Sequence, residues 1–220
     1  MQIFTNKKNI KHNILHHENG RSMVEMLGVL AIIGVLSVGA IAGYSKAMMK
    51  HKFNKQSAQI SYILDYLILN YTTNLKLENH SEFHLGPLLR KLGIISQDMI
   101  KQTDKTYSYD VFGTKIGIEN HRATDGGGIA LGLYITDSQL SVEICRNIFI
   151  IAKERSNDID QVIMSRKLGT GSSTVVSRHF GDKQLNKSSY LRNLTMKDIY
   201  NACDICQDTT SCTVNILHGY

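Results

Sequence analysis

The sequence predicts an α+β protein in which one long N-terminal helix packs on an antiparallel sheet. Three observations support this fold class: an uncharged apolar stretch near the N-terminus, an amphipathic helical pattern that follows it, and a series of short alternating segments in the second half. The chain has 220 residues, of which 42% are hydrophobic and 20% charged, which suits a globular domain with an appendage. We expect three parts: a polar leader at 1–20, an apolar helical segment at 21–52 and a globular head at 53–220.

The apolar stretch lies between Glu25 and Lys46, where twenty residues in a row carry no charge. A helix rises about 1.5 Å per residue, so this stretch spans roughly 30 Å, the thickness of the hydrocarbon core of a bilayer. The segment is therefore long enough to cross a membrane.

The first twenty residues are polar and basic, and they precede the apolar run. A secretory signal peptide is cleaved after its apolar part. Here the natural cleavage position is between Gly20 and Arg21, before the apolar part, so the helix would remain on the mature protein.

Apolar residues then recur at intervals of three and four between Phe53 and Leu77. This pattern predicts one continuous helix from about Met23 to about Lys76, apolar all round in its first half and amphipathic in its second. The amphipathic face consists of Ile60, Ile63, Leu64, Leu67, Ile68, Tyr71 and Leu75.

Alternating segments and turn residues predict the elements of the head. Gly113 is expected to turn a hairpin, and Thr195 is expected to precede a short helix. Thr136 or Asp137 is expected to cap another helix, with Gln139 in the capping-box position after Thr136. His121 and His179, each beside an arginine, are expected at the surface. The expected strands are 107–111, 116–118, 129–135, 162–166, 174–180 and 212–218, with short helices at 88–92 and after residue 136.

The four cysteines are Cys145, Cys203, Cys206 and Cys212. An even number of cysteines in the part expected to be exported indicates disulfides formed in an oxidising compartment, with three connectivities open. The alternative is a zinc site built on Cys203-x-x-Cys206 with Cys212 and either Cys145 or His218. A second CxxC pair is missing from the sequence, which weakens this alternative.

Three features together resemble the N-terminus of a type IV prepilin: a polar leader ending in Gly20, a glutamate at Glu25, and the aliphatic run MLGVLAIIGVLSVGAIAGY. The resemblance implies a pilin fold, cleavage after Gly20 by a prepilin peptidase, and N-methylation of Arg21. It also implies that the helix serves first as a membrane anchor and then as the core of a filament. Arg21 stands where the family usually has Phe or Met, and Ala42 where many members have proline, which is closer to the type IVb branch.

The resemblance also implies roles for individual residues. The carboxylate of Glu25 would pair with the N-terminal amine of Arg21 in a neighbouring subunit and set the register of the filament. Type IVb pilins join a cysteine in a mid-chain helix to one near the C-terminus. This implies a pairing of Cys145 with Cys203 and leaves Cys206 to pair with Cys212.

The function expected on this basis is that of a structural subunit of a type IV pilus, a helical homo-oligomer with roles in adhesion, aggregation or motility. The motifs HExxH, GxSxG and GxxxxGK[ST] are missing from the sequence, so we expect neither an enzyme nor a cofactor or metal. The expected partners are the prepilin peptidase, the inner membrane and its assembly platform. The expected location is the bacterial inner membrane and then the cell surface.

Two alternatives remain open. A pseudopilin of a type II secretion or DNA-uptake system would share the same N-terminus. A membrane-tethered extracytoplasmic enzyme or metal-binding domain would have no use for Gly20 or Glu25. The formal net charge of +6 gives only weak support for DNA as a partner.

Overall fold

The structure is a computed structural model that describes residues 22–71, 83–121, 128–136, 139–167, 172–184, 187–207 and 211–219. The chain divides into two compact units, Met1–Ala47 and Met48–Tyr220, which we call the N-terminal unit and the head. The division lies a few residues before the one expected at 52/53. The expected leader at 1–20 lies outside the described residues.

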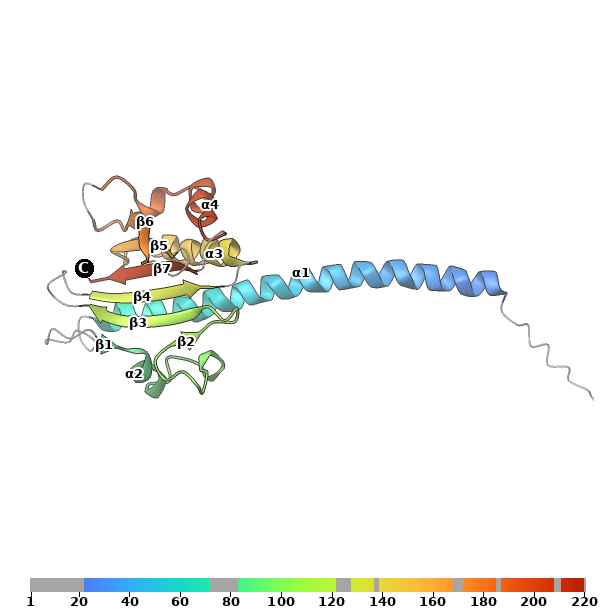
Figure 1. Ribbon diagram of the computed structural model, residues 1–220, viewed down its shortest axis with the longest axis horizontal. Coiled ribbons are helices and arrows are strands. Elements are labelled where there is room, and N and C mark those ends of the chain that lie inside the picture. Colours follow the sequence, from blue (N-terminus) through green and yellow to red (C-terminus); the bar gives the residue numbers. More distant parts are fainter. Residues whose placement is uncertain are drawn as a thin grey trace, which may run out of the picture. The chain divides into compact units, whose positions relative to one another are not determined.

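Helix α1 runs without interruption from Met23 to Asn70 (Figure 1). Ser22 begins it: the backbone N–H of Val24 donates to the Ser22 hydroxyl at 3.3 Å, and that of Glu25 donates to the Ser22 carbonyl at 2.9 Å. The one proline of the chain lies well beyond the helix, so nothing inside α1 removes a backbone donor. The predicted continuous helix is confirmed as far as Asn70, and 72–76 lie outside the described residues.

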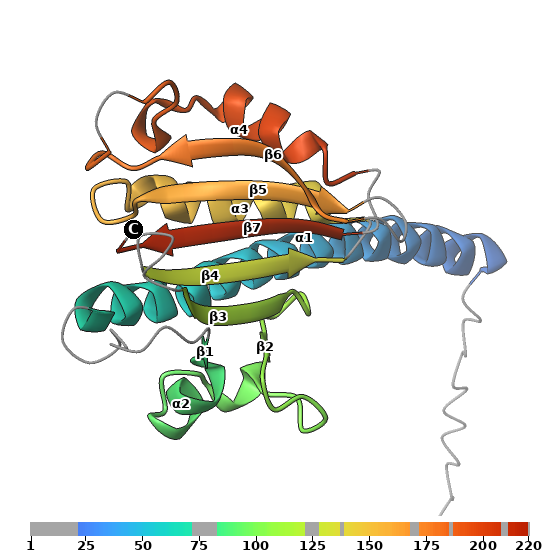
Figure 2. The same cartoon turned by 60° about the vertical axis from the view of Figure 1, so that its left-hand side comes forward.

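The head contains one antiparallel sheet of seven strands, in the order β1-β3-β4-β7-β5-β6, with β2 also pairing to β3 (Figure 2). The last strand of the chain, β7, therefore lies between β4 and β5, in the middle of the sheet. The strands are β1 (Phe83–His84), β2 (Ser108–Tyr109), β3 (Lys115–His121), β4 (Gly128–Ile135), β5 (Gln161–Lys167), β6 (Thr174–Phe180) and β7 (Ser211–His218).

One face of the sheet is buried under helix α3 (Ser141–Glu154) and the C-terminal half of α1 (Figures 1 and 2). Two rows of apolar side chains cross this face from β3 to β5, because strand residues alternate between the faces and paired residues lie side by side. The stripe expected on α1 is buried here, with Ile60, Ile63, Leu64 and Leu67 at most 2% exposed. The rows are Ile118–Leu131–Ile216–Val162 and Ile116–Leu133–Val214–Met164.

Four short helical elements complete the described head: α2 (Gly86–Lys91), η2 (Gln97–Met99), η4 (Leu191–Asn193) and α4 (Met196–Asp204). The helix expected after Thr195 is confirmed as α4, and Thr195 forms a capping box with Asp198. The capping box expected at Thr136 and Gln139 is wrong. Helix α3 begins later, at Ser141, and no side chain caps it at Leu140. The Ser141 hydroxyl instead donates to the Cys206 carbonyl at 2.9 Å.

A buried polar network ties α1 to the rest of the head. Gln56 is fully buried; its amide N–H donates to the Asp110 carboxylate, and its amide oxygen accepts from Asn147 of α3 at 2.8 Å. The other Asp110 oxygen accepts the backbone N–H groups of Phe112 and Thr114, both at 2.8 Å. Burial raises the pKa of the Asp110 carboxyl above its ordinary value, while these hydrogen bonds lower it. The network therefore fixes which turn of α1 faces the connection between β2 and β3.

We expect Asp110→Asn to destabilise the head by about 1–3 kcal/mol, the usual cost of an unsatisfied buried polar group. The asparagine side chain has only one oxygen, which can accept either from the two backbone N–H groups or from Gln56. Its NH₂ group then faces the donor that is left, so that donor has no acceptor. Thermal unfolding should show a melting temperature several degrees lower, at about 2–4 °C per kcal/mol.

Asp98→Asn is the matched control, since Asp98 also contacts α1, through Lys55 at 2.6 Å and Gln59 at 3.2 Å, but has a side chain that is 46% exposed. Exposed ion pairs contribute at most about 1 kcal/mol. Equal effects of the two substitutions would show that the Asp110 network does not hold α1.

Candidate functional site

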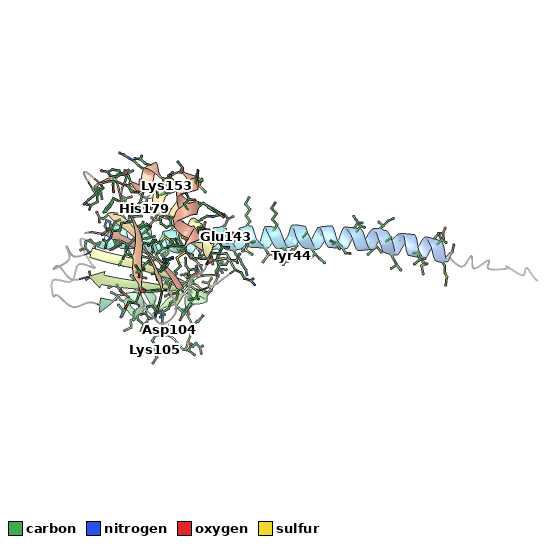
Figure 3. The ribbon with its side chains drawn as sticks, turned by 45° about the horizontal axis from the view of Figure 1, so that its top comes forward. Tyr44, Asp104, Lys105, Glu143, Lys153 and His179 are labelled. Carbon is green, nitrogen blue, oxygen red and sulfur yellow. A yellow bond between two sulfur atoms is a disulfide. The ribbon has the colours of Figure 1, made fainter. Side chains whose placement is uncertain are left out.

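The N-terminal unit presents an apolar helix surface on every side. Every large apolar side chain from Met23 to Ile41 is between 50% and 84% exposed. Figure 3 shows these side chains around α1, together with the labelled Tyr44. Within the described residues, α1 is the one helix long and apolar enough to cross a membrane. A surface of this kind requires lipid or another protein to cover it.

Glu25 is the single acidic residue of this surface. It lies exposed in the first turn of α1, where the helix dipole favours a negative charge. The other residues expected at this site, Gly20 and Arg21, lie outside the described residues. The structure thus places Glu25 at the start of the apolar helix, and its pairing with the amine of Arg21 stays a prediction.

The same helix contains four glycines, and no neighbouring group in the described chain requires the small side chain at these positions. A Cβ atom added at Gly28, Gly34, Gly39 or Gly43 would have no neighbour within 4 Å. At 3.6 residues per turn, Gly28, Gly39 and Gly43 share one side of the helix with Glu25. Each glycine costs about 0.5–1 kcal/mol in a helix interior, relative to alanine. No contact within the described chain therefore requires a glycine at these four positions.

The head is closed by two disulfides. Cys145 of α3 joins Cys203 of α4, and Cys206 joins Cys212 of β7. This is the pairing that the resemblance implied. No cysteine is left free as a thiolate ligand, so the zinc site considered above is not formed. In the described parts of the chain, no group of three or more His, Cys, Asp or Glu residues could hold a metal ion.

His179 is half-buried, whereas the sequence predicted a surface position. Strand alternation turns its neighbour Arg178 outward, and His179 faces the helices, with its ring 5.6 Å from that of Phe149 on α3. Burial lowers the pKa of His179 below its ordinary value. The adjacent arginine misled the prediction, because strands place neighbouring residues on opposite faces. The side chain of His121 lies outside the described part of the structure.

Comparisons with models of known protein families, with curated proteins and with solved structures find no match. The architecture nevertheless is pilin-like: a long apolar N-terminal helix, followed by an antiparallel sheet and two disulfides. The apolar helix and the disulfides indicate a membrane-anchored or extracytoplasmic protein.

The two disulfides should differ in their contribution to stability. Cys145–Cys203 closes a loop with a sequence separation of 58, and Cys206–Cys212 one of 6. Chain entropy gives about 4 kcal/mol for the first and about 2 kcal/mol for the second. We expect Cys145→Ala/Cys203→Ala to lose more free energy of unfolding than Cys206→Ala/Cys212→Ala. Urea unfolding of the full chain in detergent micelles measures both, and equal losses would contradict the expectation.

Proposed function

We propose that the chain is a structural subunit of a type IV pilus, closest to the type IVb branch. In this proposal the chain is cleaved between Gly20 and Arg21, anchored in a bacterial inner membrane and then polymerised through α1. The observation that carries the proposal is the exposed apolar surface of α1 from Met23 to Ile41. A membrane anchor alone would also use such a surface, so the assembly step rests on two further features, Glu25 and the glycines.

Glu25 supports assembly because a simple anchor gains nothing from it. A carboxylate within the hydrocarbon region costs about 2.5–3.5 kcal/mol on insertion scales unless it is paired. In a bundle of copies, the N-terminal amine of Arg21 in a neighbouring subunit would neutralise it. The ion pair would set the register of the subunits, and the aliphatic surface would hold them together.

The glycines support the same proposal. Small residues allow helices in a membrane to approach closely, and Gly39 with Gly43 has the small-xxx-small spacing. Gly28 leaves a shallow hollow beside Glu25, lined also by Met26, Val29 and Ile32. A side chain from a second copy would fill this hollow, so the side of α1 that carries Glu25 would be the one that packs most closely.

In the proposal the head is a non-enzymatic outer surface that serves adhesion, aggregation or motility. The second candidate, a pseudopilin of a secretion or DNA-uptake system, shares the α1 features. The large head with two disulfides favours a pilus exposed outside the cell, where covalent links resist unfolding. Long surface filaments distinguish a pilus from a pseudopilin.

We expect Glu25→Gln to abolish surface filaments while leaving the chain in the membrane. The amide has nearly the same shape, but it lacks the charge that would pair with the Arg21 amine. Electron microscopy of sheared filaments and immunoblots of membrane and filament fractions measure the two outcomes. Glu154→Gln, at an exposed position at the end of α3, is the control and should leave filaments intact. If the Glu25→Gln variant formed normal filaments, the charge of Glu25 would have no role in assembly.

The mass of the protein from its native membrane tests processing separately. We expect a chain that begins at Arg21, with or without one added methyl group, and that gains about 4 Da on reduction because two disulfides take up four hydrogen atoms. A chain that retains Met1 to Gly20 would exclude cleavage by a prepilin peptidase. It would favour the membrane-tethered domain instead.

A further inference from the structure

The two apolar rows of the sheet end in polar residues at β6. Val162 pairs with His179 in one row, and Met164 pairs with Ser177 in the other. Both positions continue rows whose members from β3 to β5 are all apolar. Polar residues at core positions are unusual unless a function requires them.

Neither polar side chain is fully satisfied. Among the described residues, the Ser177 hydroxyl oxygen and the His179 Nε2 atom are buried without a hydrogen-bond partner. His179 Nδ1 lies 2.8 Å from the Ser189 hydroxyl, and this contact holds Ser189 beside β6. Buried polar atoms without partners reduce stability, so packing alone does not explain His179 and Ser177.

A cavity of about 330 Å³ opens beside His179, at the edge of the head formed by β6, η4 and the start of α4. Its volume lies at the lower end of the range of small-molecule sites, about 300–1,000 Å³. Figure 3 shows the labelled His179 and Lys153 in this part of the head. The cavity is lined by His179 together with Ser188, Ser189, Tyr190, Asn193, Leu194 and Asp198.

The walls of the cavity are held in place by contacts outside it. The Lys153 ammonium group donates to the Leu194 carbonyl and fixes η4 to α3. The backbone N–H of Phe180 donates to the Ser189 carbonyl at 2.8 Å, and that of Lys187 donates to the Tyr190 hydroxyl at 3.1 Å. A site held in this way loses little freedom when a ligand binds.

The lining groups restrict the chemistry of the ligand. The lining contains no lysine or arginine, and burial keeps His179 neutral near pH 7, so an anion finds no cation. Leu194 is the one aliphatic residue of the lining, so an apolar ligand finds little to cover. The hydroxyls of Ser188 and Ser189 and the amide of Asn193 can both donate and accept hydrogen bonds, and the Tyr190 ring adds a flat aromatic surface.

We propose that this cavity binds one unit of a neutral sugar, whose hydroxyl groups both donate and accept hydrogen bonds. All the lining residues belong to the loop that Cys145–Cys203 closes, so this disulfide supports the site. The proposal does not depend on filament assembly and applies to the head of the single chain.

The test uses the full chain in phosphatidylcholine nanodiscs, which contain no sugar that could compete. Binding of glucose, galactose, mannose and N-acetylglucosamine would be measured by saturation-transfer NMR. Inorganic phosphate is the anionic probe, and its binding would be measured by ³¹P line broadening. We expect saturable binding of at least one of the four sugars, with a Kd of about 1 mM. Absence of saturable binding of all four up to about tenfold that Kd would overturn the proposal, as would saturable binding of phosphate alone.

Matched variants locate the binding. Asn193→Ala should weaken the Kd at least tenfold, whereas Asn201→Ala, at an exposed position of α4 outside the lining, should leave it unchanged. His179→Phe should also remove binding, while its melting temperature equals or exceeds that of the parent because the apolar row is extended. Sugar binding that survives Asn193→Ala at the parent Kd would overturn the proposal even if His179→Phe failed to fold.

Discussion

The head depends on the burial of the C-terminal half of α1 against the sheet. The apolar stripe of Ile60, Ile63, Leu64 and Leu67 provides the area, but apolar contacts alone would tolerate a helix shifted by one turn. The hydrogen bonds of Gln56 to Asp110 and Asn147 are directional, and a shift would leave buried polar groups without partners. Hydrophobic burial therefore holds the helix, and the polar network selects its position.

Much of this fold follows from local patterns in the sequence. Intervals of three and four locate α1, and alternation locates β4, β5 and β6 close to their observed bounds. Other features depend on tertiary contacts that local patterns do not contain. The insertion of β7 between β4 and β5 is set by pairing over long sequence separation, and β1, with two residues, is too short to show alternation. Glu25 and the cysteines could be found from residue type and spacing. The cavity beside His179 could not, because its walls meet only in the fold.

The two halves of α1 meet opposite requirements within one helix. Beyond Met48, its glycine-free sequence packs one face against the sheet and exposes mainly polar residues elsewhere, with Tyr62 and Leu69 as exceptions. Before Ala47, four glycines and an apolar surface would weaken a soluble helix. In lipid every backbone group must be bonded within the helix, so helical structure persists there despite glycine. The composition of α1 thus changes where its surroundings must change.

The edge of the head at α4 uses covalent links where its apolar burial is small. This nine-residue helix buries only Ile199 and Cys203, and a helix of this length is unstable by itself. Cys203 attaches it to α3, Cys206–Cys212 attaches the following turn to β7, and the Thr195 capping box satisfies its start. Because these bonds hold the edge together, the face of β6 beneath it can carry Ser177 and His179 in place of apolar residues. If burial alone held this edge, the two apolar rows would have to extend to β6. The disulfides therefore make the polar cavity beside β6 possible.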